Sequence, residues 1–320
     1  MKRRCFAVLM LLFGPAAAGA QLPGQNIVNF RAVGMDVTIR YREDRLRQMD
    51  SQFRPVLIGA LERYTELFGG RPRGQDGHPL AQLTVHVQSD PLGAGDAEVG
   101  VIHLLVARQP LFGFYDWRLV LLHEAFHLWS AQSFRFAGPA EQWFNEGTAE
   151  FYALQTAARM ELVDDITTIR NAATMVGFYT SAADQDRMSL TEAGQQKSGH
   201  HFLIHHGGFT AALMLDRTIR GRTAGAKSLD DVMRWLYATF DRETKLYTSL
   251  DIARGLREAA GHDAGELFAK SIMGRLPLSL SPVANLGELA RGVQAGRAGM
   301  RDVPPPDQFL AASLGIAGKR

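Results

Sequence analysis

The segment His123-Glu124-Ala125-Phe126-His127 holds two histidines four positions apart, with a glutamate directly after the first. On a helix, residues i and i+4 lie one above the other, so both imidazoles would point to one place. Zinc binds imidazole nitrogen at about 2.0–2.1 Å, and a catalytic zinc keeps one position open for water. Glu124 would then face that water as general base. The pattern predicts a zinc site; two hydrogen-bonded histidines on a buried helix are the alternative.

A second acidic motif, WFNEGTAE, follows at 143–150. Eighteen residues separate His127 from Glu146, and this H-x18-E spacing resembles that of the gluzincin zinc metallopeptidases. Two histidines and a carboxylate form a known catalytic zinc set. The resemblance therefore implies that His123, His127 and Glu146 bind one Zn²⁺, and it favours the zinc site over the structural alternative.

Two residues near Glu146 are expected to support the ligands. Glu150 lies one turn further along the same predicted helix, where its carboxylate would hold the second ring nitrogen of a ligand histidine. Asn145, the neighbour of Glu146 in the chain, is expected behind the ligands as well.

The elements that must position these residues follow from local patterns. Asp116 is a helix-capping residue type, and the apolar run after it has no Gly or Pro until Gly138, which predicts a helix of about four turns. Helical spacing at 43–68 predicts a packing helix in which Pro55 causes a kink or begins a second helix. Alternation predicts strands at 83–87 and 97–106. The polar stretch 185–197 is expected to be loop. The sequence therefore predicts an α+β fold.

The region from about 42 to 280 resembles the catalytic part of the glycyl aminopeptidase family of gluzincins. The residues that carry this resemblance are HEAFHLW at 123–129, WFNEGTAEFY at 143–152, SLTEAG at 189–194 and the stretches 207–240 and 261–278. The resemblance implies a thermolysin-like (zincin) catalytic domain with one zinc ion. The chain would be a minimal member without the PDZ domain that relatives often carry.

The expected domain organisation follows from this resemblance. Residues 21–280 would form the metallopeptidase domain, with a small sheet-bearing N-terminal lobe at about 21–112 and a mainly helical lobe at about 113–280. Residues 281–320 would form a C-terminal extension, wrapped or disordered, because they contain Pro304-Pro305-Pro306 and little periodicity.

The same family has a Tyr-x-x-Gly pattern whose tyrosine is thought to stabilise the oxyanion. Counting back from Gly208 places His205 at that position, and histidine can donate the same hydrogen bond; His206 and Tyr179 are the alternatives. His201 and His205 are also four apart, but the glycines around them argue against a rigid helix and a second metal site.

Two observations bear on the substrate end of the site. An edge strand at 97–106 would accept an extended peptide by strand addition. In relatives such a strand carries a glutamate that holds the substrate's amino terminus, but Gly100-Val101-Ile102-His103 has none. Glu98 is a further candidate for binding an amine, with an ordinary solvated charge as the alternative. Aminopeptidase and endopeptidase action therefore both stay open.

Residues 1–20 have the pattern of a cleaved signal peptide. Basic residues at 2–4 precede the apolar run 5–13, and Ala18-Gly19-Ala20 has the form of a cleavage site. Export to the periplasm or the medium is expected. Removal of this segment takes away the only cysteine and lowers the formal net charge from +2 to −1. No basic stripe points to nucleic acid, and no second apolar span points to a membrane.

The combined prediction is an exported zinc-dependent peptidase that acts on a peptide or protein. Two alternatives are kept: a catalytically decayed gluzincin module that only binds peptides, and a zinc hydrolase of a non-peptide bond. The sequence leaves the substrate preference and the oligomeric state open.

Overall fold

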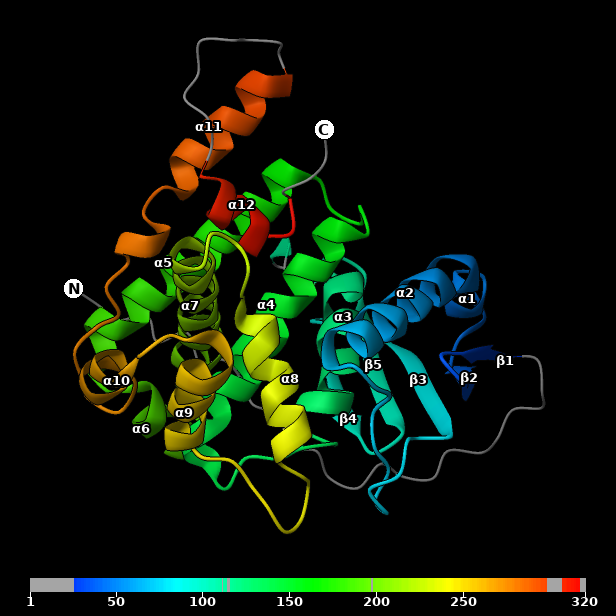
Figure 1. Ribbon diagram of the computed structural model, residues 1–320. Helices are drawn as coiled ribbons and strands as arrows, with labels where there is room; N and C mark the ends of the chain where they lie inside the picture. Colours follow the sequence, from blue (N-terminus) through cyan, green and yellow to red (C-terminus); the bar gives the residue numbers. More distant parts are fainter. Residues whose placement is uncertain (1–25, 111, 114–115, 197, 298–306, 317–320) are drawn as a thin grey trace.

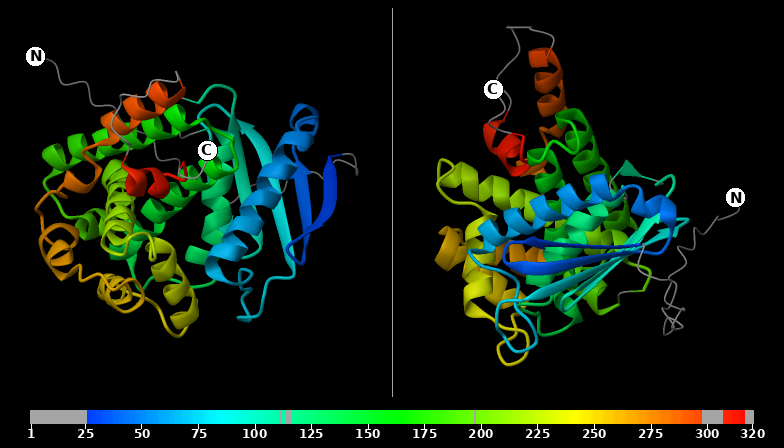
Figure 2. Two further views of the ribbon diagram at one scale, coloured as in Figure 1. Left: turned by 45° about the horizontal axis from the view of Figure 1, so that its top comes forward. Right: turned by 90° about the vertical axis from the view of Figure 1, so that its right-hand side faces the viewer.

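The protein consists of a five-stranded sheet on one side and a group of helices on the other (Figures 1 and 2). The computed structural model describes residues 26–110, 112–113, 116–196, 198–297 and 307–316. The predicted signal peptide at 1–20 lies outside the described residues. Within them, every helix is too short or too polar to cross a membrane.

The sheet has the strand order β1-β2-β3-β5-β4. The outer strands pair antiparallel with their neighbours, and the inner pairs β2–β3 and β3–β5 are parallel. Alternate side chains of the inner strands are buried on one face, as the period-2 pattern of a half-buried strand requires. The strands are β1 (Ile27–Ala32), β2 (Met35–Tyr41), β3 (Gln82–Asp90), β4 (Ala94–Glu98) and β5 (Val101–Ala107).

The single strand expected at 97–106 is instead a hairpin. Its turn is Val99-Gly100, and Gly100 has φ +72°, a left-handed conformation that favours glycine. The edge of the sheet is therefore β4, whereas β5 lies inside between β3 and β4. The edge strand is therefore 94–98 and not 97–106. The segment Gly100-Val101-Ile102-His103, which was compared with the edge strand of relatives, lies in the turn and in the internal strand β5.

Two helices, α2 (Asp50–Phe68) and α3 (Trp117–Ser130), pack beside the sheet (Figure 1). A short helix, α1 (Asp44–Arg47), precedes α2. Pro55 lies inside α2 near its start, so it neither ends nor begins a helix there. Gly69, in the left-handed region at φ 73°, ends α2, as its sequence predicts.

The helical part contains the rest of the described chain. Its elements are, in order, η2 (Pro139–Glu141), α4 (Gln142–Arg159), α5 (Asp165–Asp186), α6 (Leu190–Gln195), η3 (Phe202–Gly207), α7 (Gly208–Arg222), α8 (Leu229–Thr239), α9 (Ser249–Ala260), α10 (Gly265–Leu267), η4 (Phe268–Ile272), η5 (Ser281–Val283), α11 (Leu286–Arg297) and α12 (Gln308–Ser313). Ser228 and Thr248 cap α8 and α9 with capping boxes.

One further expectation is corrected. The stretch 185–197 contains the end of α5 and the helix α6, whose capping box of Ser189 and Glu192 offsets the polarity that favoured a loop. For 281–320 a wrapped or a disordered extension was open; in its described part Leu310 is buried and Gln155 of α4 donates a hydrogen bond to the carbonyl of Ser313 at 2.9 Å. It packs against the helical part as α11 and α12.

Candidate metal centre

Helix α3 carries the first two histidines of the predicted site. It begins where the sequence predicts, because the Asp116 side chain accepts a hydrogen bond from the backbone N–H of Arg118 at 2.9 Å. Every residue from Leu119 to Ser130 is buried. An all-round buried helix holds its side chains in fixed positions between the sheet and α4.

Helix α4 carries the acidic residues and crosses η3 and α7 at very short range. A Cβ added to Gly208 would overlap the backbone oxygen of Trp143, and a Cβ on Gly147 would overlap the backbone of Gly208. These two glycines are therefore required by the close approach of the helices. The approach brings Glu146 and Glu150 of α4 next to His205 of η3.

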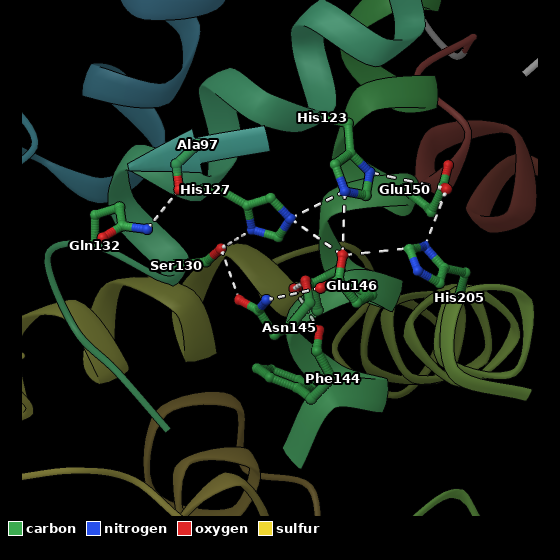
Figure 3. A network of polar contacts seen from close by, with 11 residues as sticks. Ala97, His123, His127, Ser130, Gln132, Phe144, Asn145, Glu146, Glu150 and His205 are labelled. Carbon is green, nitrogen blue, oxygen red and sulfur yellow. Dashed lines mark hydrogen bonds and ion pairs between the residues drawn. The ribbon is translucent and has the colours of Figure 1, made fainter. Parts of the chain in front are cut away.

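Three predicted ligand atoms converge on one point (Figure 3). The Nε2 atoms of His123 and His127 are 2.9 Å apart, and the Oε2 atom of Glu146 lies 3.3 Å and 3.2 Å from them. Tetrahedral zinc with ligand distances near 2.0–2.1 Å places its ligand atoms about 3.3 Å apart. The donor types and their separations therefore fit zinc with little adjustment.

His205 is a competing ligand from a different element. Single donor atoms of His123, Glu146 and His205 all lie within 4.8 Å of one another, so these residues could also hold a metal ion. However, His205 Nδ1 is 4.0 Å from Glu146 Oε2, further than the corresponding distance from His127. The shorter separations favour His127 as the third ligand and leave His205 beside the site.

Polar groups behind the ligands hold them in place. His127 Nδ1 is 3.2 Å from the Ser130 hydroxyl, which lies 3.3 Å from the side-chain oxygen of Asn145. The Asn145 amide donates to Glu146 Oε1 at 3.4 Å. Asn145 thus contacts both Ser130 and the predicted ligand Glu146. Ser130 was missed, although its spacing of three from His127 on a helix was a usable signal.

Glu150 lies between two histidines. Its Oε1 atom is 3.8 Å from His123 Nδ1 and 3.5 Å from His205 Nδ1, the latter an ion-pair distance at the long limit of a hydrogen bond. Burial opposes ionisation, but the hydrogen bond from His205 and the charge of His123 hold the pKa of Glu150 at about 2. Burial likewise opposes ionisation of Glu146, but His127 and His123 keep its pKa well below the usual range. Both carboxyl groups are therefore ionised at neutral pH.

Glu124 lines the same cavity as Glu146 and lies against the edge strand β4. A Cβ on Gly95 would overlap the Glu124 side chain, so the glycine makes room for it. Burial raises the pKa of Glu124 to about 8; the His123 charge opposes this rise, and the charge of Glu146 adds to it. A group with this pKa can both take up and release a proton near neutral pH. No sequence signal pointed to Gly95.

A cavity of about 580 Å³ opens in front of these groups. His123, Glu124, His127, Glu146 and His205 line it at the metal end. The rest of its wall consists of Gln75, Gly95, Asp96, Ala97, Glu98, Val99, Ala131, Gln132, Arg135, Phe136, Gln142, Asn145 and Arg242.

The other two candidates for an oxyanion donor lie outside this wall. His206 is fully buried, with its ring stacked on that of Phe202 at 5.4 Å. The Tyr179 hydroxyl accepts a hydrogen bond from the backbone N–H of Leu278 at 2.7 Å. Of the three, His205 alone lines the cavity.

The histidine-rich stretch is helical after all. Phe202–Gly207 forms a π-helix that continues directly into α7, and its wider turn brings the rings of His201 and His205 to 4.0 Å between centroids. The glycines at 207 and 208 that favoured a break instead permit close packing against α4 and Leu190.

Comparison with solved structures places this architecture among known folds. An aminopeptidase N family protein from Idiomarina loihiensis superimposes with a TM-score of 0.66 at 17% identity, over 82% of this chain and 48% of that one. An M1 zinc metallopeptidase from Deinococcus radiodurans, bound to the substrate Tyr-Ser-Ala, gives 0.51 at 15% identity over 79% of this chain and 52% of that one. The fold is that of M1 zinc metallopeptidases.

A two-domain M1 zinc metallopeptidase bound to L-arginine is a third similar structure, with a TM-score of 0.53 at 14% identity over 79% of this chain and 52% of the other. The chain thus spans about half the length of the solved structures it matches. No protein-family model and no curated protein matches the sequence. At these identities the likeness supports the α+β fold alone.

Proposed function

We propose that the chain is a zinc-dependent peptidase that hydrolyses peptide bonds with Glu124 as general base. The observation that carries this proposal is the convergence of two Nε2 atoms and one carboxylate oxygen within 2.9–3.3 Å of one another. They line the same cavity as Glu124. The shared fold with M1 zinc metallopeptidases supports it. The narrower resemblance to glycyl aminopeptidases stays a prediction, as does export.

His123, His127 and Glu146 are the residues that would hold the metal. Their donor set, two imidazoles and one carboxylate, is one that catalytic zinc uses. When bound, zinc supplies a water with a pKa lowered toward about 7 and polarises a carbonyl oxygen. The ionised state of Glu146 suits this role, because its anionic oxygen and the two imidazoles match a divalent cation in charge and ligand type.

Glu124 would take the proton from the attacking water and deliver it to the leaving amine. Its raised pKa fits both halves of this task at neutral pH. His205 would donate a hydrogen bond to the developing oxyanion from the other side of the cavity. Glu150 supports this role, because its carboxylate lies at an ion-pair distance of 3.5 Å from His205 Nδ1 and would leave the second ring nitrogen to face the substrate.

The edge strand favours substrates with a free amino terminus. Asp96 and Glu98 are exposed carboxylates on β4 that line the cavity. Among the described residues, no cation lies within ion-pair distance of either side chain. Two unneutralised carboxylates beside the site attract an ammonium group. We therefore place aminopeptidase action ahead of endopeptidase action in this proposal.

The test is metal content paired with activity. Purified protein is expected to contain about one zinc per chain and to cleave members of a mixed peptide library, with cleavage lost in chelator and restored by zinc. The cut positions decide between release of terminal residues and internal cleavage. Zinc without cleavage of any peptide would move the proposal to one of its alternatives. Folded protein that binds no zinc would overturn it.

A further inference from the structure

The cavity continues past the metal-binding residues to an end that the mechanism above does not use. This end lies beyond the C-terminus of α3 and is lined by Arg135 and Arg242 together with glutamine side chains. The glutamines are Gln75, Gln132 and Gln142. The residues here are long and polar, which is unusual for a wall that only excludes water.

Both arginines lie on loops whose backbones are hydrogen-bonded to each other. The N–H of Arg135 donates to the carbonyl of Asp241 at 3.0 Å, and the N–H of Tyr247 donates to the carbonyl of Arg135 at 2.9 Å. Arg242 follows Asp241 directly, and the Asp241 carboxylate accepts backbone N–H groups of the same loop at 2.7–3.0 Å. The two guanidinium-bearing residues are therefore held on fixed backbone.

A short chain of hydrogen bonds connects this end to the edge strand. Gln132 donates through Nε2 to the carbonyl of Ala97 at 2.7 Å, and Arg242 donates through Nη1 to the carbonyl of Gln132 at 3.1 Å (Figure 3 shows the first). The N–H of Gln132 donates to the carbonyl of His127 at 3.0 Å. The arginine end therefore adjoins the Ala97–Glu98 end of β4, one turn beyond a metal ligand.

The positive charge at this end is poorly neutralised. The carboxylate nearest to Arg242 is that of Glu243, at 3.9 Å from Nε, and Glu243 is 68% exposed. Arg135 is exposed, and no carboxylate among the described residues lies within 4.0 Å of its side chain. Guanidinium groups match carboxylates in geometry as well as in charge. In a peptide substrate, the anions available to them are carboxylates.

We propose that Arg135 and Arg242 form a subsite for an acidic side chain of the substrate, and this rests on the proposed function. A peptide that adds antiparallel to β4 runs from the Glu98 end toward the Gly95 end. The residue on the amino side of the scissile bond then reaches the arginine end, while Glu98 holds its amine. The preferred substrate class is peptides with Glu or Asp at that position.

The experiment compares peptides that differ only by Glu or Gln at one position, with each position next to the cut tested in turn. Glu and Gln have nearly the same shape, so the ratio of their kcat/KM values isolates the charge. We expect the protein to prefer Glu on the amino side of the cut by about ten- to a hundredfold. Arg135→Gln and Arg242→Gln should each reduce this ratio by about tenfold or more.

A matched control removes an arginine outside the cavity. Arg257 is an exposed residue of α9, and Arg257→Gln should leave the Glu/Gln ratio as it is. Arg242 also donates a hydrogen bond to the carbonyl of Gln132, so its substitution could disturb the backbone as well. Arg135→Gln, at an exposed residue, is therefore the more specific test of the charge. A ratio near one at every position, or a preference that both variants retain, would overturn the proposal.

Failure of hydrolysis itself is a separate outcome. If no peptide is cleaved, the same Glu and Gln peptides are titrated into the protein by calorimetry. Tighter binding of the Glu peptide that Arg135→Gln abolishes would support the subsite and refute only the peptidase activity. Equal binding of both peptides would overturn the subsite as well.

Discussion

At the scale of single residues, Glu150 connects the proposed metal ligand His123 with the proposed oxyanion donor His205. Replacing it by Gln keeps the shape but removes the charge that orients both rings. We expect Glu150→Gln to weaken zinc binding by about 10–100-fold, the usual effect of losing a group behind a ligand. Competition titration with a chelating dye measures this. Glu258→Gln, on the exposed face of α9, is the control, and equal zinc affinity of the two variants would contradict the role.

His205 can be a donor to the substrate or a metal ligand, and one substitution separates the two roles. If His205 is a donor, His205→Phe keeps zinc and lowers turnover by about 10²–10³. If it is a ligand, zinc is lost together with activity. Zinc content and kcat are measured on the same preparation. His200→Asn is the control, because His200 pairs with Asp186 at 2.9 Å and does not line the cavity.

At this scale the sequence was informative because metal chemistry restricts residue type and spacing. The structure brings together the side chains His123, Glu124, His127 and Glu146, which the two motifs had singled out. It also brings in Gly95, Arg135 and Arg242, which come from a strand edge and from loops. Such residues have no periodic pattern, and their nearness to the site depends on tertiary structure alone.

At the scale of elements, the crossing of α4 with η3 and α7 sets the position of the proposed acidic ligand, Glu146. Gly208→Ala would force a Cβ into the Trp143 carbonyl, and backbone cannot give way as a flexible side chain does. We expect a loss of about 1–3 kcal/mol or more in the free energy of unfolding, with weaker zinc binding because Glu146 moves with α4. Urea unfolding measures the first effect.

Gly177→Ala is the matched control for this substitution. Gly177 lies inside α5 with nothing within 4 Å of an added Cβ, so alanine there should stabilise by about 0.5–1 kcal/mol. If Gly208→Ala behaved like Gly177→Ala, the close approach would not be a requirement of the fold.

Local sequence patterns predict the capped start of helix α3 correctly but do not predict which strand forms the edge of the sheet. The side chain of Asp116 accepts a hydrogen bond from the first turn of α3, a short-range effect that residue type reveals. The hairpin at 94–107 resembles a single strand in the sequence because apolar residues continue across Gly100. The sequence does not predict the π-helix at 202–207, because its Gly207 packs against Leu190 and Tyr179 and the following Gly208 packs against α4, contacts that only the tertiary structure reveals.

At the scale of the whole molecule, a buried histidine links folding to pH. His206 is fully buried beside aromatic rings, and burial lowers its pKa from 6.5 to about 4. The unfolded chain therefore takes up a proton below about pH 6.5 that the folded protein takes up only near pH 4. Stability that is present above pH 6.5 is lost as the pH falls toward 4, by roughly 3 kcal/mol over this range.

His206→Phe tests this link, since phenylalanine suits the aromatic surroundings and does not titrate. Its free energy of unfolding should fall less steeply than that of the unchanged protein between pH 6.5 and 4, and both should have the same slope above pH 7. Urea unfolding at a series of pH values provides the comparison. Parallel curves over the whole range would rule out His206 as the source of acid sensitivity.

The arrangement of the whole molecule also explains how one cavity could serve both the proposed metal and the proposed substrate. The sheet contributes the edge strand β4, the helices contribute ligands and donor, and α3 lies between them with Glu124 next to Gly95. The described part of the C-terminal extension packs on the helical part and does not line the cavity. The α+β architecture was predictable from alternating and helical patterns, whereas the order of its strands was not.

The most direct test of the central claim is the variant Glu124→Gln, with zinc content and peptide cleavage measured on one sample. Glu124 is not among the proposed ligands, so the variant should keep about one zinc per chain. Its cleavage of peptides that the unchanged protein hydrolyses should fall by about 10²–10⁴-fold, because the proton acceptor is gone. A zinc-loaded Glu124→Gln protein that cleaves peptides at the normal rate would contradict the account.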